Sequence, residues 1–564
     1  MPEDYTLLYV AAGILTLVIL AVMTVRSRLG AKKRLLKKVR EGYGRIPDRG
    51  YTQEELQKIR KYTDAVSGDA AFFVDDITWN DLSMDDIFIR MNHTFSSAGE
   101  EVLYALLRTP CYDTAELAER ERLMTYFREH PDVRESLSLE YLKIGRTRKY
   151  AMVDFLDTLK GLALKPDWRY LLHTALLVLS LVTAFLWPSA GVMMLLVVLA
   201  VNIYNYYHLK SEIEPHYVSL AAMAYLVNGG LKIASVKHDG IETYQEALDV
   251  HAKPLKSITN LVLWLGTGSF SASQDFLQLI LDFLRMITLA DLFQFNRMVR
   301  KVRNQEAHLL ALIQTMGYLE AMISVASYRE TLAYYAVPEI QEGEPRLTMI
   351  DGYHPLVSGP VPNSFSTRNP VLVTGSNASG KSTFLKMTAL NALLSETVHT
   401  VHASQYSGTF FRIYSSMALK DSLATNESYY MVEIRSIKRI MDDDSEDVPV
   451  LCFVDEVLRG TNTVERIAAS AQILKHFRQK GVLCFAATHD VELTYMLELY
   501  YDNYHFEENF ENGEISFSYR ILDGRATTRT AIKLLSVMGY DPEVTEEAER
   551  TAEHFMREGS WPVL

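Results

Sequence analysis

The sequence predicts a chain of α plus α/β class, in which a helical part with membrane-spanning helices precedes a C-terminal α/β domain on a mostly parallel sheet. Residues 6–25 and 170–207 contain no Asp, Glu, Lys or Arg, and residues 208–345 are mostly amphipathic in a helical period. These patterns predict the helical part. Three short apolar runs predict buried parallel strands, at residues 371–374, 450–454 and 482–487.

Length, net charge and cysteine content exclude several classes of protein. Its 564 residues are enough for more than one domain with a sizeable core. The net charge of −13 argues against a general nucleic-acid coat, because non-specific affinity for DNA comes from neutralised phosphates, but it does not exclude a local basic channel. The three cysteines have no metal-ligand spacing and are too few for a disulfide framework, which indicates a reducing setting for most of the chain.

The first predicted membrane helix is residues 6–25, a length sufficient to cross the hydrocarbon core of a bilayer. A signal peptide is the alternative, but residues 1–5 are acidic and no small-residue cleavage site follows the apolar run. Residues 26–40 carry eight basic side chains and no acidic one, which by the positive-inside rule places this flank in the cytoplasm and residues 1–5 outside. We therefore expect a basic juxtamembrane linker over 26–74, in contact with membrane lipid.

Residues 170–207 are predicted to form a transmembrane hairpin of two spans, 170–187 and 190–207, joined by a turn at 187–191. A buried core hairpin is the alternative, although a soluble domain rarely needs two adjacent charge-free helices of this length. Basic or histidine residues flank both outer ends: Lys165, Arg169, His208 and Lys210. This topology predicts a multi-pass protein of the plasma membrane, with the N-terminus outside and both soluble parts in the cytoplasm.

The strand predicted at 371–374 runs into a glycine-rich loop that matches the phosphate-binding pattern G-x-x-x-x-G-K-[ST] and opens a helix. Glycines let the loop curl so that backbone N–H groups point at phosphates, and the helix N-terminus favours their negative charge. We expect Lys381 to reach the β- and γ-phosphates of ATP and the Ser382 hydroxyl to ligate Mg²⁺. The residues predicted to bind the nucleotide are Gly375, Ser376, Asn377, Ala378, Ser379, Gly380, Lys381, Ser382 and Thr383.

Two later apolar runs end in residues suited to phosphate chemistry. The run at 450–454 leads into Asp455 and Glu456, at the strand end where ligands bind in parallel sheets. Asp455 is placed to hold the magnesium shell, and Glu456 to orient or deprotonate an attacking water. His489 follows the run at 482–487 and is placed to touch the γ-phosphate, whereas a histidine without the other motifs is more often a cap or core residue. The predicted catalytic residues are Glu456, His489 and Lys381, and the predicted metal ligands are Ser382 and Asp455.

The stretch between Lys381 and Asp455 indicates the subclass. Its 73 residues leave no room for a long coiled coil, and it contains no LSGGQ-like sequence of a transporter subunit. Five ordered motifs instead resemble the MutS family of DNA mismatch repair ATPases, a branch of the ABC-type ATPase superfamily. They are YHPLV at 353–357, VHASQ at 401–405, DSLATNESYYMVE at 421–433, DEVLRGTNT at 455–463 and ATHDVELT at 487–494.

The resemblance also implies a domain organisation. Residues 75–169 are similar to the first part of the family's helical core and residues 208–345 to its lever helices, so the hairpin interrupts that core. Residues 346–564 resemble the P-loop ATPase domain with its closing helical segment for dimerisation. We expect no counterpart of the family's mismatch-reading and connector domains, because about 75 residues precede the core and 20 of these form the predicted anchor.

The resemblance implies an ATP hydrolase that works as a homodimer with composite sites. Ser428 of the signature loop, with Asn426 and Glu433 nearby, would reach the γ-phosphate bound by the partner. The predicted function is therefore a membrane-anchored, ATP-hydrolysing homodimer coupled to binding of mismatched or branched DNA, with a further protein partner unidentified. An ATP-driven transport or membrane-remodelling machine without a DNA role remains the alternative, although the predicted spans lack the charged residues that ion pathways require.

Overall fold

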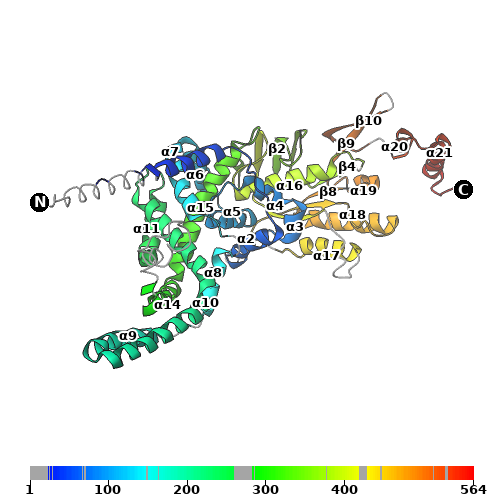
Figure 1. Ribbon diagram of the computed structural model, residues 1–564. Helices are drawn as coiled ribbons and strands as arrows, with labels where there is room; N and C mark the ends of the chain where they lie inside the picture. Colours follow the sequence, from blue (N-terminus) through cyan, green and yellow to red (C-terminus); the bar gives the residue numbers. More distant parts are fainter. Residues whose placement is uncertain are drawn as a thin grey trace. The chain divides into compact units, whose positions relative to one another are not determined.

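The computed structural model describes most of the chain and divides it into two compact units (Figure 1). The helical unit comprises residues 1–68, 91–105 and 123–330, and the α/β unit comprises 69–90, 106–122 and 331–564. The residues that the structure does not describe are 1–14, 16–22, 24–25, 28, 67, 69–70, 148–149, 163, 165, 260–282, 285, 377, 418–428, 445–446, 512–513, 527–530 and 564. The membrane helix predicted at 6–25 lies almost entirely outside the described residues.

Helix α15 (Glu306–Arg329) forms the centre of the helical unit. Every residue from Leu319 to Arg329 is buried, because apolar and small side chains occur on all faces of this half of the helix. Residues 29–42 are also helical. The remaining described helices with residues in this unit are α2 (Gln53–Val66), α5 (Ser97–Arg108), α6 (Thr114–Glu129), α7 (Pro131–Ile144), α8 (Met152–Gly161), α9 (Asp167–Leu186), α10 (Pro188–Ser235), α11 (Glu242–Ala252) and α14 (Ala290–Asn304).

A buried carboxyl group joins α15 to the start of α5. Glu320 Oε1 accepts hydrogen bonds from the backbone N–H groups of Phe95 at 2.5 Å and Ser96 at 3.1 Å, and Glu320 Oε2 accepts one from the Ser96 hydroxyl. These bonds satisfy N–H groups at the N-terminus of α5, which have no partner within the helix. Burial raises the pKa of Glu320 to about 8. Gly99 is required here, because a Cβ at this position would overlap the Glu320 carboxyl group, with Cδ 2.6 Å away.

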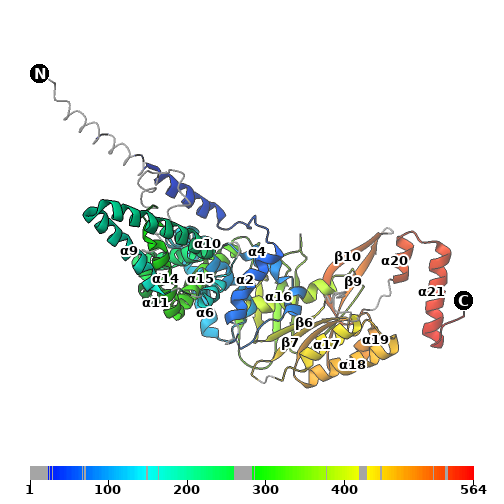
Figure 2. The same cartoon turned by 60° about the horizontal axis from the view of Figure 1, so that its bottom comes forward.

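Helices α9 and α10 form the hairpin that the sequence predicts (Figure 2). Gly191 lies where the two helices approach closely, so that a Cβ would overlap the backbone of Ala184. The hairpin leaves large apolar side chains exposed, including Phe185 at 87%, Met193 at 69% and Leu196 at 60%. Helix α10 continues without a break to Ser235, over 48 residues, so the second predicted span is only its first half.

Three described helices have the length and composition to cross a membrane: Asp167–Leu186, Pro188–Ser211 and Glu306–Arg329. Their burial separates them, since the most apolar windows of the first two are 17% and 22% buried, whereas that of α15 is 72% buried within the protein. Packing therefore explains the apolar composition of α15, but it does not explain that of the hairpin. Whether the hairpin crosses a membrane stays a prediction.

The α/β unit is built on a six-stranded sheet of order β10-β9-β4-β8-β7-β6. All neighbours pair in parallel except β9 and β10, which form an antiparallel edge hairpin. The predicted mostly parallel sheet is confirmed, and its central strands are fully buried. The strands are β4 (Val371–Thr374), β6 (Arg412–Ser416), β7 (Val450–Asp455), β8 (Leu483–Ala487), β9 (Asp502–Glu511) and β10 (Glu514–Asp523).

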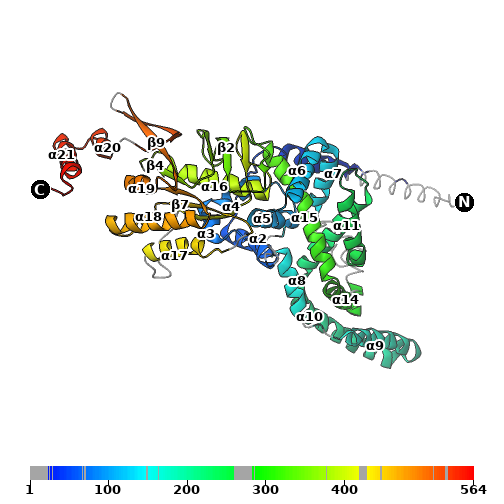
Figure 3. The ribbon, with the colours of Figure 1, turned by 180° about the vertical axis from the view of Figure 1, so that it is seen from behind.

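Helices cover both faces of this sheet (Figure 3). On one face Cys452 and Cys484 pack with Leu474 and Phe477 of α18. On the other face Phe485 stacks on Phe453, with ring centroids 5.4 Å apart, and also contacts α16. This alternation explains why the strands read as continuous apolar runs. The helices of the α/β unit are α3 (Asp76–Asp81), α4 (Met84–Met91), α16 (Lys381–Thr397), α17 (Tyr429–Met441), α18 (Thr463–Gln479), α19 (Val491–Met496), α20 (Ala531–Val537) and α21 (Pro542–Glu558).

Two further features complete the unit. A second sheet has the order β1-β5-β2-β3, and the segment around α3 covers the edge strand β6 of the large sheet. There Asp81 Oδ2 accepts hydrogen bonds from the Ser415 hydroxyl at 2.7 Å and from the Met417 N–H at 2.8 Å. Arg439 of α17 pairs with Asp75 at 2.7 Å. The strands of the second sheet are β1 (Glu339–Ile340), β2 (Leu347–Gly352), β3 (Asn363–Thr367) and β5 (Gln405–Gly408).

Candidate nucleotide site

The predicted motifs meet because their strands are neighbours. Strand β8 lies between β4 and β7, and Ala487 at its end pairs with Val373 on one side and with Asp455 on the other. The three carboxyl ends therefore lie at one edge of the sheet, where parallel sheets bind their ligands. The loop after β4, the loop after β8 and the acidic end of β7 share this edge.

The glycine-rich loop has the curled backbone that its sequence predicts. Gly375 has φ of +143° and Gly380 has φ of +107°, a region that side-chain-bearing residues avoid. A Cβ at Gly375 would also lie 2.8 Å from Ser379 Oγ. Gly380 is the N-cap of α16, so the helix N-terminus opens onto the loop. Asn377, one of the predicted binding residues, lies outside the described residues.

Lys381 folds back onto the loop that it belongs to. Its Nζ donates to the carbonyl oxygens of Gly375 and Ser376, both at 2.7 Å, and the residue is 3% exposed. Burial is the main cause that lowers the pKa of Lys381 to about 8, while Asp455 and Glu456 act in the opposite direction. The ammonium group is thus held at the mouth of the loop by carbonyls that phosphate oxygens can replace.

The two predicted metal ligands are in contact. The Ser382 hydroxyl donates to Asp455 Oδ2 at 2.6 Å, so both oxygens point at the same place. Nearby, the buried Ser376 Oγ has no hydrogen-bond partner in the described part of the chain. Among the described residues no group of three or more His, Cys, Asp or Glu side chains could hold a metal. This donor set fits Mg²⁺, which binds few protein oxygens and takes its remaining ligands from phosphates and water.

Glu456 and His489 form the second polar pair of the site. Glu456 Oε1 lies 2.8 Å from His489 Nε2, and Glu456 Oε2 lies 3.0 Å from Nε of Arg459. The hydrogen bond from His489 is the largest cause that lowers the pKa of Glu456, and the charge of Arg459 adds to it. Glu456 also has φ of +60°, a strained conformation of the kind that accompanies functional sites. The structure therefore keeps this carboxylate ionised and aimed at the loop edge.

The histidine loop is fixed from outside the site. Arg466 of α18 donates two hydrogen bonds to the Asp490 carboxylate, at 2.9 and 2.6 Å. His489 Nε2 also lies 3.4 Å from Lys381 Nζ. The structure thus brings Lys381, Glu456 and His489 together, as the sequence predicts.

A cavity of about 350 Å³ lies beside the loop. Gly380, Thr383 and Phe384 line it from the start of α16, and Tyr519 of β10 lines it from the edge hairpin. His354 also lines it, and burial lowers the pKa of this histidine to about 4, so the ring is neutral. The lining is mostly apolar with a few polar groups, as is typical of sites for small ligands.

Comparison with known proteins finds a family that the C-terminal part of the chain resembles. Residues 371–556, which include all the loops described above, match the family described as MutS domain V. This C-terminal part of the chain is similar to MutS proteins.

Several DNA mismatch repair proteins named MutS are similar to this chain. One from Thermus thermophilus is 33% identical over 208 residues, which cover 36% of this chain and 25% of that protein. That from Thermus aquaticus is 30% identical over 243 residues, covering 42% and 30%. That from Lactobacillus acidophilus is 29% identical over 279 residues, covering 47% and 32%. The chain thus spans about a quarter to a third of the length of the curated relatives it matches.

The structure adds contacts of Arg459 and Glu433 to the nucleotide site. Arg459 was part of a motif, but its contacts with Glu456 and with the Asp455 backbone carbonyl, at 2.6 Å, appear only in the structure. Buried Glu433 of α17 accepts from the Arg459 N–H at 3.2 Å, which connects the signature helix to the end of β7. The contact between Glu456 and Arg459 could have been inferred from their spacing of three positions in the sequence. Ser428 and Asn426 lie outside the described residues.

Proposed function

We propose that this protein is a membrane-anchored ATPase of the MutS type, which hydrolyses ATP as a homodimer in the cytoplasm. The observation that carries this proposal is the convergence of Lys381, Ser382, Asp455, Glu456 and His489 at one sheet edge, at the contacts given above. Five residues from three loops meet there, and each has the chemistry that phosphoryl transfer from ATP to water requires.

The proposed reaction follows from these contacts. Lys381 exchanges its two carbonyl acceptors for the β- and γ-phosphate oxygens, and backbone N–H groups at the start of α16 bind the remaining phosphate charge. Ser382 and Asp455 would hold Mg²⁺, which would neutralise charge on the phosphates. Glu456 orients a water and accepts its proton, and His489 stays bonded to that carboxylate and faces the γ-phosphate. The adenine base occupies the cavity that Phe384, His354 and Tyr519 line.

The homodimer rests on the family resemblance. The loop that contains Ser428 leads directly into α17, and Glu433 of α17 contacts Arg459 beside the catalytic carboxylate. We propose that Ser428 reaches the γ-phosphate bound by the partner, so that closure of the dimer completes each site. Through Glu433 and Arg459, the same closure would adjust the position of Glu456.

Membrane attachment is supported by the exposed apolar surface of the α9–α10 hairpin. Leu171, Leu179 and Leu181 of α9 are between 53% and 58% exposed, and Val197 of α10 is 58% exposed. A contiguous apolar surface of this kind marks contact with a membrane or with another protein. Together with the predicted helix at 6–25, we propose three spans in the plasma membrane, with residues 208–564 in the cytoplasm.

For the substrate acted upon, we propose DNA, since the relatives are named as DNA mismatch repair proteins. The exposed hairpin favours a second candidate, an ATP-driven membrane-remodelling or transport machine with no DNA role. Fluorescence anisotropy with mismatched, branched and plain duplexes, repeated at several salt concentrations, distinguishes the two candidates. Binding that is stronger for one DNA structure supports the first, and a flat signal at every salt concentration removes it.

The hydrolysis proposal is tested with Glu456→Gln, which keeps the side-chain shape but cannot accept a proton. We expect the steady-state rate of ATP hydrolysis to fall by about 10²- to 10⁴-fold, with ATP affinity within about threefold of wild type. Glu465→Gln, the same change on the exposed surface of α18, is the matched control and should leave the rate within about twofold. Full activity in Glu456→Gln would refute the assignment of the base.

A further inference from the structure

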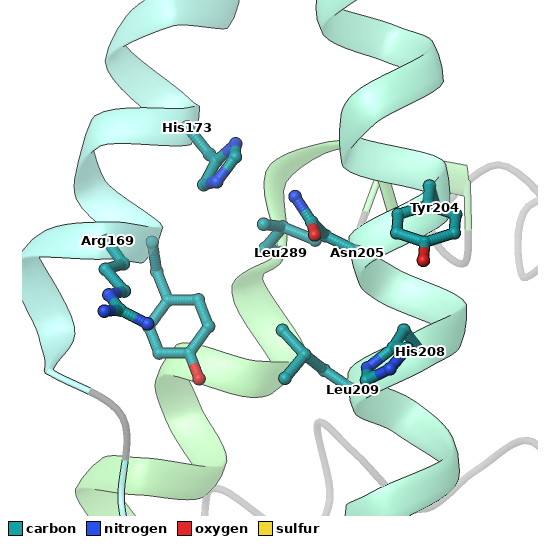
Figure 4. A pocket seen from close by; sticks show the side chains of 8 residues that line it. Arg169, His173, Tyr204, Asn205, His208, Leu209 and Leu289 are labelled. Atoms are coloured by element: carbon teal, nitrogen blue, oxygen red, sulfur yellow. The ribbon is translucent and has the colours of Figure 1, made fainter.

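A cavity of about 310 Å³ lies between α9, α10 and the turn that precedes α14 (Figure 4). It is remote in sequence from the nucleotide site, and none of the residues that line it in the described part of the chain is acidic. Leu209 and Leu289 form its apolar part. The polar side chains that line it are Arg169, Tyr170 and His173 of α9 and Tyr204, Asn205 and His208 of α10.

The wall of this cavity is held by hydrogen bonds among the surrounding helices. Asn202 of α10 bonds to His173 Nδ1 at 2.8 Å and donates to the Ile287 carbonyl at 2.8 Å. The Thr174 hydroxyl donates to the Thr288 carbonyl at 3.1 Å. Tyr170 is buried in a small apolar cluster with Leu289. A pocket with a wall of this kind is formed before any ligand arrives, so binding costs little ordering.

The charge around the cavity is positive. Asp167 is the acidic residue closest in sequence to Arg169, and it is paired with Arg300 and accepts a hydrogen bond from Asn296 at 3.3 Å. Its charge is therefore compensated outside the cavity. Arg169 is exposed at the cavity rim and has no ion pair among the described residues, and His208 adds a second nitrogen base to the rim. The rim thus suits an anion.

The polar side chains of the cavity lie at two depths along the α9–α10 hairpin. Arg169 and His208 sit at the ends of the two charge-free segments, which is the headgroup level if the hairpin spans a bilayer. Asn205 lies about one helical turn further toward the bilayer, and in Figure 4 it and His173 extend from opposite helices into the same space. A glycerophospholipid has this order of groups, with a phosphate at the headgroup level and ester carbonyls one level deeper.

We propose that this cavity binds an anionic glycerophospholipid of the cytoplasmic leaflet. Arg169 and His208 bind the phosphate, the Asn205 amide donates to an ester carbonyl, and Leu209 and Leu289 contact the start of an acyl chain. Basic pockets between membrane helices on the cytoplasmic side are a known form of lipid recognition. This inference rests on the membrane role proposed above for α9 and α10, and it adds a specific ligand to it.

The test uses the full-length protein in nanodiscs, with phosphatidylglycerol mixed into phosphatidylcholine as the probe. Native mass spectrometry counts the phosphatidylglycerol molecules that each protein retains. We expect the double variant Arg169→Ala/His208→Ala to weaken retention at least tenfold, and Asn205→Leu, which leaves Arg169 and His208 in place, to weaken it severalfold. Lys210→Ala removes a positive charge from the same flank but outside the cavity, and should stay within twofold of wild type.

Two outcomes overturn the proposal. Equal losses in Lys210→Ala and in the double variant would mean that general surface charge attracts the lipid. Displacement of phosphatidylglycerol by millimolar soluble glycerol 3-phosphate would mean that the site takes a free phosphate ester. The membrane role itself is tested separately: if alkaline carbonate extracts the wild-type protein from membranes, the membrane role is refuted. If carbonate extracts the protein, glycerol 3-phosphate binding that depends on Arg169 would still show a phosphate site without a lipid.

Discussion

The contact between Gly99 and Glu320 gives a sharp test of how the helical unit is held together. In Gly99→Ala the new methyl group overlaps the Glu320 carboxyl group, which must move away from the start of α5. The Phe95 N–H, the Ser96 N–H and the Ser96 hydroxyl then lose their shared acceptor. Each buried donor left without a partner costs about 1–3 kcal/mol, so we expect the loss of three such bonds to cost α5 roughly 3–9 kcal/mol of local stability.

The assay is amide hydrogen exchange over residues 97–108, because a chain with two compact units does not unfold in a single step. A loss of this size corresponds to exchange about 10²- to 10⁶-fold faster. Gly161→Ala, at the end of α8 with no atom within 4 Å of the new Cβ, is the control and should not change these rates. In a Glu320→Ala background, Gly99→Ala should cost almost nothing further, since the clashing group is gone. Unchanged protection in Gly99→Ala, or additive costs in the double variant, would refute the reasoning.

Three further predictions concern other contacts. Gly191→Ala should separate α9 from α10, because the new methyl group overlaps the α9 backbone. Disulfide cross-linking between cysteines placed in the two helices should then fall severalfold, and full cross-linking would contradict this. Glu320→Gln should gain roughly 3–5 kcal/mol of local stability over wild type between pH 4.5 and pH 8, since the raised pKa makes the wild-type carboxyl lose stability as pH rises through that window. Protection of the α5 amides from hydrogen exchange, corrected for the intrinsic pH dependence of exchange, measures this at several pH values, and parallel profiles would count against it. Arg466→Ala should lower the rate of ATP hydrolysis about tenfold at nearly constant KM, because the loop that carries His489 loses its two hydrogen bonds from Arg466 to Asp490. An unchanged rate would show that the loop holds its position without Arg466.

The parts of the site that depend on local geometry could be predicted from the sequence. Gly375 and Gly380 are needed for the curl of the loop, and Lys381 must follow the second of them, so their spacing alone identifies the loop. Asp455 and Glu456 come at the end of a buried apolar run, and sheet topology brings that end to the loop. The mostly parallel sheet follows from the same short apolar runs.

Contacts between residues far apart in the sequence could not be predicted in this way. Asp75 pairs with Arg439, 364 positions later, and no local pattern around either residue indicates the other. Glu320 sits in an apolar helix, where its role as the cap of α5 depends on the packing of two distant segments. The strained φ of Glu456 is similar, because it depends on the bond from its N–H to the Ala487 carbonyl of the neighbouring strand.

The unbroken length of α10 has a mechanical consequence. Its 48 residues extend for about 70 Å at 1.5 Å per residue, whereas a bilayer core is about 30 Å thick. One helix therefore joins the apolar hairpin to its continuation at residues 208–235, with one main-chain hydrogen bond missing at Pro215, which has no N–H. Each residue along it adds a rotation of about 100°. Two residues inserted between 216 and 235 would turn one half by about 200° against the other, so the number of residues in this segment sets how the two halves are rotated relative to each other.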